Sequence, residues 1–295
     1  MGSHRFYFIL GVIIVLIWGT TFVSTKVLIT NGLVPHEIFF VRFLVAYFFI
    51  WFFSPRILFA NNIKDEFQMI VLGVVGGSLY FVTENFALSQ SYTTNVSFIV
   101  CSSPLLATIL AVVIYRRKTH VTWNLVLGTI MAVLGVFLLI SNGRFMLKPN
   151  SIGDILALVA CLSWAVYSLL IKKLLNRYSS VFLTRKVFFY GVITVSPLFL
   201  WRPWQFPLSD FTKPVVLGNI AYLSLCASLA CFSAWAFVVK HIGVMKATNL
   251  VYLNPISTMV ASIVFLSEPI SFISAIGSFL ILLGVIVSDQ SKFCV

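Results

Sequence analysis

The sequence is poor in charge, and acidic residues are the scarcer kind. Only 9% of its 295 residues are charged, against roughly 25% in soluble domains, and it has 8 Asp and Glu beside 20 Lys and Arg. Hydrophobic residues make up 60% of the chain, and the mean hydropathy is +1.04. This composition excludes an ordinary water-exposed surface, so we expect an integral membrane protein.

Residues that bind metals or perform catalysis are also few. The five cysteines lie within or beside apolar runs without metal-ligand spacing, so neither a disulfide framework nor a zinc site is expected. The four histidines, which lie at the ends of apolar runs, form no HExxH motif, and no run contains paired acids or a Walker loop. We therefore expect no enzyme, no ATP hydrolysis, no metal and no cofactor.

The net charge of +12 would indicate nucleic-acid binding in a soluble chain. Here the Lys and Arg residues lie in the short gaps between apolar runs, where they set the topology of a membrane protein. The expected partners are membrane lipids and a small-molecule substrate, and nucleic acid is not among them.

Long apolar runs recur along the whole chain. About 20 residues of helix cross the roughly 30 Å of hydrocarbon in a bilayer. The runs predict ten transmembrane helices at residues 6–29, 36–53, 67–90, 94–115, 121–141, 152–174, 180–201, 214–238, 245–266 and 270–288. The predicted fold class is therefore an all-α membrane protein.

Charge in the short loops predicts the orientation of these spans. If the N-terminus is inside, the outer loops carry only Arg144, Lys148, Arg202 and Lys213, and most other basic residues lie inside. We therefore expect both termini in the cytoplasm and the chain in the inner membrane. Near the inner face, Lys172, Lys173 and Lys186 are expected to extend into lipid headgroups; the alternative is contact with a substrate carboxylate or phosphate.

The two halves of the sequence resemble each other. LIWGTTFVSTKVL from Leu16 and LSWAVYSLLIKKL from Leu162 both place Trp eight residues before Lys, and glycines recur seven apart in 128–135 and 277–284. Five spans in each half mean that the second half enters the membrane in the opposite direction. We expect two inverted repeats, residues 1–145 and 146–295, which is a transporter architecture.

Several motifs together resemble the EamA-like branch of the drug/metabolite transporter superfamily. They are WGTTF in the first span, the run from Arg42 to Ala46, Ala87-Leu88 through to Pro104, the segment from Tyr252 to Pro255, and Ser267-Glu268-Pro269 before a Gly-rich last helix. The first half has Tyr115-Arg116-Arg117-Lys118 where the second has Glu268, so no mechanistic role is carried over to that turn.

The resemblance implies a ten-helix secondary transporter that works by alternating access. It implies a central cavity walled by helices 1, 3, 4, 6, 8 and 9, with helices 5 and 10 as a scaffold. Family members move small metabolites such as amino acids, or drugs, frequently outward. The bacterial inner membrane is the location that follows.

Glu84 lies inside the third span, where a carboxylate is costly without a partner or water. At 1.5 Å per residue, Lys26 and Arg42 reach a similar depth in the first two spans. These three residues are therefore candidates for a charge network. One reading is a salt bridge that pins helices together; the other is that Glu84 exchanges a proton or binds a substrate amine.

Other polar and aromatic residues recur at helical spacing on single faces of the spans. Asn and Ser side chains also precede Pro104 and Pro255, which interrupt helices at mid-membrane depth. The candidates for a substrate cavity are Trp18, Phe22, Thr25, Tyr80, Glu84, Asn95, Ser102 with Ser103, Trp164, Ser168, Asn249, Tyr252 and Asn254. For each of them, simple core packing is the competing interpretation.

The sequence leaves the transport mode open. The same helices suit a carrier of a soluble metabolite, a flippase of a lipid-linked headgroup, or a channel. It also leaves open whether protons or a counter-substrate drive transport, and which substrate is carried.

Overall fold

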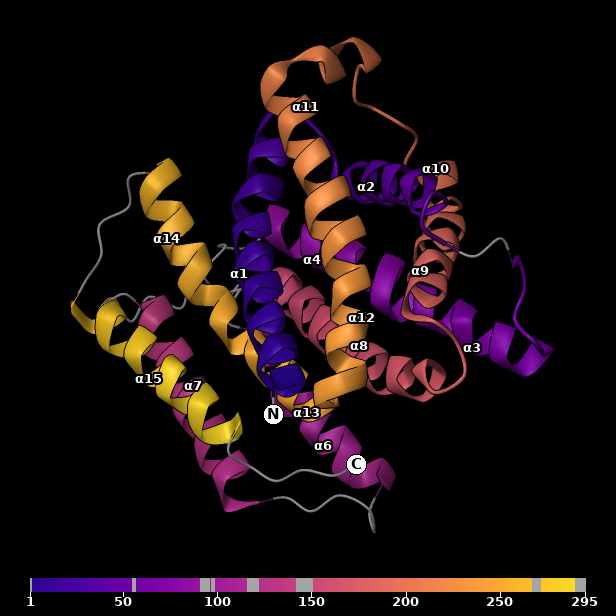
Figure 1. Ribbon diagram of the computed structural model, residues 1–295. Helices are drawn as coiled ribbons and strands as arrows, with labels where there is room; N and C mark the ends of the chain where they lie inside the picture. Colours follow the sequence, from indigo (N-terminus) through magenta and orange to yellow (C-terminus); the bar gives the residue numbers. More distant parts are fainter. Residues whose placement is uncertain are drawn as a thin grey trace.

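The computed structural model describes residues 2–54, 57–90, 96, 99–115, 122–141, 151–266 and 272–289. Every regular element within these ranges is a helix (Figure 1). Two residues considered from the sequence, Asn95 and Glu268, fall outside the described residues.

The described residues of the first half follow the predicted spans closely. The elements are α1 (Gly2–Thr30), α2 (Pro35–Ile50), a continuous rod of α3 (Ile63–Gly73), η1 (Val74–Ser78) and α4 (Leu79–Gln90), then α6 (Ser103–Tyr115) and α7 (Trp123–Ser141).

The described residues of the second half also follow the predicted spans. Its elements are α8 (Ser151–Leu175), α9 (Ser180–Val195) with the short α10 (Leu198–Trp201), the 3-10 turn η2 (Leu208–Thr212), a rod of α11 (Pro214–Ala221), η3 (Tyr222–Ala230) and α12 (Cys231–Ile242), a broken rod of α13 (Val244–Asn249), η4 (Leu250–Leu253) and α14 (Asn254–Leu266), and α15 (Phe272–Asp289).

Length and hydropathy make these helices membrane-spanning. Within the described residues, five are both long and apolar enough to cross a bilayer: His4–Thr30, Ile63–Gln90, Ile152–Leu175, Ser180–Trp201 and Pro214–Ile242. The remaining helices fall in order on the other predicted spans, so the prediction of an all-α membrane protein of ten helices is confirmed.

Local sequence signals set the helix ends. Asn62 caps α3 by accepting a hydrogen bond from the Asp65 backbone N–H at 2.7 Å, and Ser179 caps α9 in the same way. Gly32 and Gly243 have φ values of 102° and 85°, which are strained for other residues, and they separate α1 from α2 and α12 from α13.

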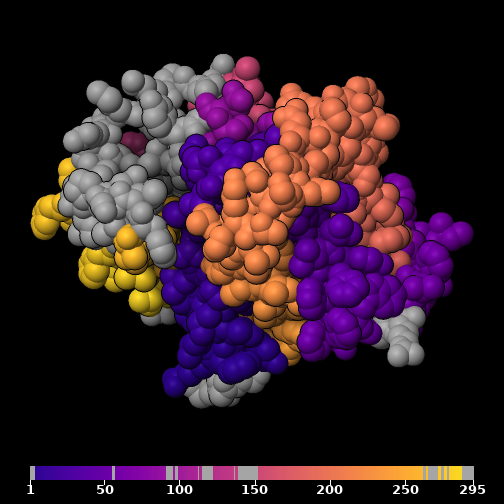
Figure 2. Space-filling view, turned by 90° about the horizontal axis from the view of Figure 1, so that it is seen from above, coloured from indigo at the N-terminus to yellow at the C-terminus, as the bar shows by residue number. Residues whose placement is uncertain are grey.

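The two halves are interleaved in space. In Figure 1, α7 and α15 lie side by side at one edge, α1, α8 and α12 run through the middle, and α2, α3 and α9 form the other edge. Figure 2 shows indigo α1 directly against the orange segment that contains α11. The start of α1 and the end of α15 lie at the same lower end of the bundle in Figure 1.

Glycines bring α7 and α15 into close contact. A Cβ added to Gly284 would lie 2.6 Å from the Gly128 carbonyl oxygen and from the Ala132 nitrogen. A Cβ on Gly135 would lie 2.6 Å from the Gly277 carbonyl oxygen. Small residues at these positions allow the backbones to touch, as in other membrane helix pairs.

We predict that Gly284→Ala destabilises the protein, because the new methyl group meets backbone atoms that cannot move aside. Overpacking of this kind costs about 1–3 kcal/mol. Gly218→Ala is the matched control, since a Cβ there meets nothing within 4 Å. Thermal unfolding in detergent measures both. Equal melting temperatures for the two variants would contradict the close α7–α15 contact.

Candidate functional site

A cavity lies between the two halves, near the middle of the bundle. Its volume is about 30 Å³, which is well below the roughly 300–1,000 Å³ of typical ligand pockets. The space suits a few waters or a small chemical group. It is lined by Trp18, Thr21, Phe22, Arg42, Tyr80, Phe81, Glu84, Val100, Ser103, Trp164, Phe232, Val251 and Asn254.

The walls come from both halves of the chain. Lining residues come from α1, α4, α6, α8, α12 and the η4–α14 segment. These elements belong to the first, third, fourth, sixth, eighth and ninth spans, which are the ones that the resemblance implied. Arg42 of α2 also lines the cavity. Helices α7 and α15 contribute no lining residue among the described residues; they pack on each other instead. The site is thus formed only when the two halves are assembled.

Two opposite charges face this cavity without forming an ion pair. Glu84 accepts a hydrogen bond from the Tyr80 hydroxyl at 3.0 Å. The Arg42 Nε donates to the Ser228 hydroxyl at 2.5 Å, and its guanidinium lies 4.5 Å from the centre of the Phe81 ring. Both residues are at least nine-tenths buried, yet among the described residues neither has an ion-pair partner within 4.0 Å.

Lys26 lies apart from this pair, which corrects the expectation of a network of three charges. Its Nζ donates to the Leu88 carbonyl oxygen at 3.1 Å, so it satisfies the backbone at the end of α4. Counting residues along the helices predicted only a depth for Lys26. It did not give the rotation of α1, which turns the side chain toward the backbone of α4.

A cluster of aromatic rings forms part of the cavity wall. The Trp18 ring centre lies 5.3 Å from that of Trp164, 5.5 Å from Phe232 and 5.0 Å from Trp235. The Trp18 Nε1 also donates to the Ala227 carbonyl oxygen at 3.0 Å, which fixes the ring across the boundary between the halves. Trp18 and Trp164 therefore act in core packing and in the cavity wall at once.

Other candidates from the sequence are buried near the cavity but do not line it. Ser168 donates back to the Trp164 carbonyl oxygen at 2.8 Å. Gly76, one turn before Tyr80 on the same helical rod, packs against the Tyr167 ring, leaving no space for a Cβ. Thr25, Asn249 and Tyr252 are also buried without lining the cavity, and Ser102, which is half-buried, does not line it either.

Some lining residues carried no signal in the sequence. Phe81, Val100, Phe232 and Val251 are apolar residues in apolar helices, and Thr21 is a common helix-face residue. Their type does not distinguish a cavity wall from lipid contact. Only the tertiary packing shows which way they face.

Three of the rods depart from α-geometry beside the cavity. The rod of α13, η4 and α14 changes to a 3-10 turn at Leu250–Leu253, just before Asn254 and Pro255, which is the break that the sequence predicted. Two further segments, η1 and η3, are π-helical and occupy corresponding places in the third helical rod of each half. Such π segments are frequent at functional sites.

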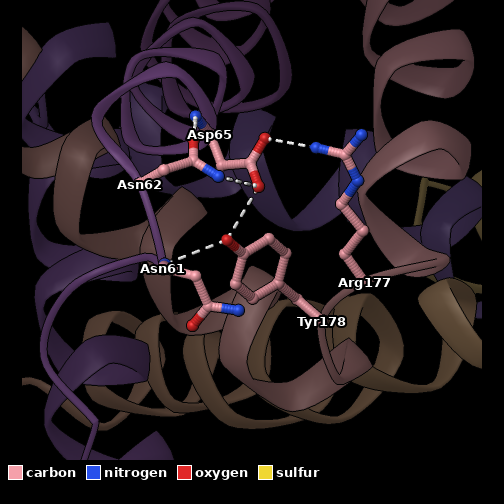
Figure 3. Close-up of polar contacts among 5 residues, drawn as sticks. All are labelled: Asn61, Asn62, Asp65, Arg177 and Tyr178. Atoms are coloured by element: carbon pink, nitrogen blue, oxygen red, sulfur yellow. Dashed lines mark hydrogen bonds and ion pairs between the residues drawn. The ribbon is translucent and has the colours of Figure 1, made fainter.

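A polar network closes the bundle at the Asp65 end, which we define as the end formed by the α2–α3 and α8–α9 turns (Figure 3). The Asp65 carboxylate accepts hydrogen bonds from the Arg177 guanidinium and the Tyr178 hydroxyl, both at 2.8 Å, and from the Asn62 amide at 3.1 Å. Tyr178 in turn accepts from the Asn61 backbone N–H at 3.0 Å.

The Tyr178 hydroxyl is held in its donating form. Burial raises the pKa of Tyr178 above its ordinary value, and the adjacent Asp65 carboxylate adds to the increase. Tyr178 therefore remains protonated at neutral pH. Through it, the short α8–α9 turn of the second half is tied to the α2–α3 turn of the first.

Glu66 forms a second link at the same end. It pairs with Lys186 and also accepts a hydrogen bond from the Tyr190 hydroxyl, both of α9. The expectation that Lys186 extends to lipid headgroups, alongside Lys172 and Lys173, is therefore wrong for Lys186. Its side chain is buried because the Glu66 carboxylate compensates its charge.

The opposite end of the bundle, which we define as the Glu37 end, is closed by a buried carboxylate. The Glu37 side chain accepts from the backbone N–H groups of Gln205 and Phe206 at 2.5 and 3.2 Å, and from that of Val34 at 3.0 Å. It therefore holds the chain after α10 onto the start of α2. The sequence reading missed this role because Glu37 lies at the edge of an apolar run, where acids are common.

Comparison with known proteins places the chain among membrane transporters. The profile of the EamA-like transporter family matches twice, at residues 5–141 and 151–288. The sequence is 26% identical over 94% of its length to an uncharacterized transporter of Archaeoglobus fulgidus, with 95% of that protein covered. It is 29% identical to the uncharacterized transporter YyaM of Bacillus subtilis, with 77% of this chain and 74% of that one covered.

Two further similarities bear on substrate and fold. A probable terminal-alkyne amino-acid exporter of Streptantibioticus cattleyicolor is 25% identical, with 77% of this chain and 74% of the exporter covered. A solved crystal structure superimposes with a TM-score of 0.74 over 96% of both chains at 17% identity. The second similarity concerns the fold alone.

We predict that Asp65→Asn lowers the melting temperature in detergent, because it removes the charge that holds Arg177 and leaves Tyr178 with a weaker acceptor. Asp210→Asn is the matched control, since Asp210 forms a solvent-exposed ion pair with Lys213 within one turn. Thermal unfolding of the two variants measures the difference. If Asp65→Asn is as stable as Asp210→Asn, the network does not hold this end closed.

Proposed function

Because the chain belongs to the EamA-like transporter family, we propose that it carries a small zwitterionic metabolite, such as an amino acid, across a membrane by alternating access. The observation that supports this most directly is the pair of opposite charges in the cavity wall. Arg42 and Glu84 line the same cavity from different helices and form no ion pair with each other.

Both charged groups have atoms left to bind a ligand. Tyr80 occupies one oxygen of Glu84, and Ser228 occupies the Nε of Arg42. A carboxylate on the substrate complements the guanidinium, and an ammonium group complements Glu84. A zwitterion supplies both at once, so it compensates two buried charges that otherwise lack an ion-pair partner among the described residues.

Contacts between the halves at both ends of the bundle support alternating access. They lie in the Asp65 network at one end and around Glu37 at the other, and the aromatic cluster adds contacts in the cavity wall. Apart from the Glu37 to Val34 and Asp65 to Asn62 bonds, these contacts join the first half to the second. Moving one half relative to the other therefore breaks the contacts at one end, which is how alternating access works in repeat transporters.

We further propose the membrane arrangement. The halves 1–145 and 146–295 are inverted repeats, and both termini lie in the cytoplasm of a bacterial cell with the Asp65 end inward. The shared end of α1 and α15 in Figure 1 and the excess of basic residues in the inner loops support this.

We propose that the direction of transport is export. We also propose that Glu84 couples transport to protons or to exchange with a counter-substrate. A relative named as a probable amino-acid exporter supports the direction. Glu84 supports the coupling because it is the one carboxylate among the described residues that lines the cavity, so a proton and a substrate ammonium compete for the same oxygen.

The substrate class is tested by counterflow in proteoliposomes with alanine, ethylamine and propionate, which carry both charges, only the positive one and only the negative one. We expect saturable counterflow of alanine alone. Alanine at 100 times its dissociation constant should stabilise the folded protein by about 2.7 kcal/mol, and a thermal-shift assay measures this stabilisation. Equal counterflow of the singly charged compounds would contradict the zwitterion site.

We predict that Glu84→Gln weakens the apparent affinity for alanine about 10- to 100-fold, because it removes a charge-assisted hydrogen bond. The variant keeps the shape of the side chain, so expression and melting temperature should change far less than transport. Asp210→Asn, an acid-to-amide change on the surface, serves as control. Counterflow at wild-type affinity by Glu84→Gln would reject the role of this carboxylate.

A further inference from the structure

Two cysteines, Cys226 and Cys231, lie five residues apart in the sequence, and the π geometry of η3 brings them together. In an α-helix, residues with this spacing face different sides and their Cα atoms are about 8.7 Å apart, which is too far for a disulfide. A π-helix instead joins residues i and i+5 by a backbone hydrogen bond. The Cys231 N–H donates to the Cys226 carbonyl oxygen in this way, so the two residues lie one turn apart on the same side of the helix.

The two thiol groups are free, and they hydrogen-bond each other. Cys226 is half-buried, whereas Cys231 is only 4% exposed. One thiol is therefore open to a small reagent, and the other lies directly behind it. Redox-reactive cysteine pairs have this arrangement, in which an accessible thiol is oxidised first and a neighbouring thiol resolves the product.

The same turn carries the residue that holds Arg42. Ser228 lies between the two cysteines in the sequence, and its hydroxyl accepts the hydrogen bond from the Arg42 Nε. The Arg42 guanidinium also interacts electrostatically with Cys231. Because Arg42 belongs to the first half and η3 to the second, a covalent bond across this turn acts on a contact between the halves.

We propose that Cys226 and Cys231 form a peroxide-sensitive site, and that their oxidation to a disulfide fixes the π turn of η3. Hydrogen peroxide is small and uncharged, so it can reach a partly exposed thiol inside the membrane. The Cys226 thiolate attacks one peroxide oxygen, the O–O bond breaks, and Cys226 becomes a sulfenic acid while hydroxide leaves and takes up the proton that the thiol released.

The neighbouring thiol completes the reaction. The Cys231 sulfur attacks the Cys226 sulfur, the S–S bond forms, the S–O bond breaks, and the oxygen leaves as water with the Cys231 proton. In all, the two sulfur atoms lose two electrons to the peroxide, and two thiols and one peroxide give one disulfide and two waters.

The disulfide should stop transport, a consequence that rests on the proposed function. A covalent link between residues i and i+5 fits a π turn but not an α turn. It therefore prevents any rearrangement of the turn that presents Ser228 to Arg42. The two halves then stay joined beside the cavity, although the protein remains folded.

The test treats the purified protein with hydrogen peroxide, blocks the remaining thiols with a maleimide and maps disulfides by mass spectrometry of peptides. We expect a Cys226–Cys231 disulfide that dithiothreitol reverses. Cys226→Ser and Cys231→Ser should not form it. The matched control Cys161→Ser, which changes a buried cysteine of α8, should form it as the wild type does. Melting temperatures verify that each variant is folded.

Three results of this mapping would overturn the site. They are two unreacted thiols, a sulfinic acid at Cys226 beside an unreacted Cys231, and a disulfide of either residue with another cysteine. Each of them would mean that Cys231 does not resolve oxidised Cys226.

Counterflow of alanine in proteoliposomes tests the effect on transport. We expect peroxide to abolish counterflow by the wild type, dithiothreitol to restore it, and Cys226→Ser to resist peroxide. If the disulfide forms and counterflow continues, the effect on transport is overturned while the disulfide site stands. If the reduced protein shows no alanine counterflow, the proposed function and the effect on transport are both overturned, whereas the disulfide site stands on the mapping.

Discussion

The constraint on which this structure depends is the cost of placing charge inside a bilayer. Glu84 and Arg42 are buried at the centre of a protein that is otherwise strongly apolar. Elsewhere in the described residues, buried acids are compensated directly: Glu66 by Lys186, Asp65 by Arg177, and Glu37 by backbone N–H groups. At the cavity the compensation is incomplete, with one tyrosine and one serine as direct partners.

This difference between the ends and the centre explains how the molecule combines stability with function. A charge that is fully paired fixes two segments in place, and removing one partner leaves the other uncompensated. The Asp65 and Glu37 ends use such pairs to join the halves. The centre keeps its charged groups available, so a ligand with complementary charges stabilises the assembled halves more than the empty cavity does.

The architecture could be predicted from the sequence because it depends on properties of short segments along the chain. Runs of apolar residues determine spans, and the Trp-to-Lys and Gly-to-Gly spacings reveal the two repeats, whose profile matches now cover both halves. The glycines whose spacing marks the repeat, Gly128, Gly135, Gly277 and Gly284, lie in the contact of α7 with α15.

The sequence was not sufficient for the contacts of long side chains. Counting residues predicts a depth for Lys26 and for Lys186, but each helix can rotate about its axis, and a Lys side chain reaches several neighbours. Lys26 therefore bonds a backbone carbonyl where an ion pair was expected, and Lys186 pairs with Glu66 where lipid contact was expected. The apolar lining residues Phe81 and Phe232 depend on the same rotation.

The π segment η1 has a consequence for the register of the helix that follows it. A π turn accommodates one residue more than an α turn, so each side chain beyond Ser78 is rotated by about 100° from the position that an unbroken α-helix would give it. Tyr80 and Glu84 both lie beyond this segment. Their orientation toward the cavity is therefore fixed six to ten residues before Glu84, at Val74–Ser78, and insertion or loss of one residue there would turn the acid out of the site.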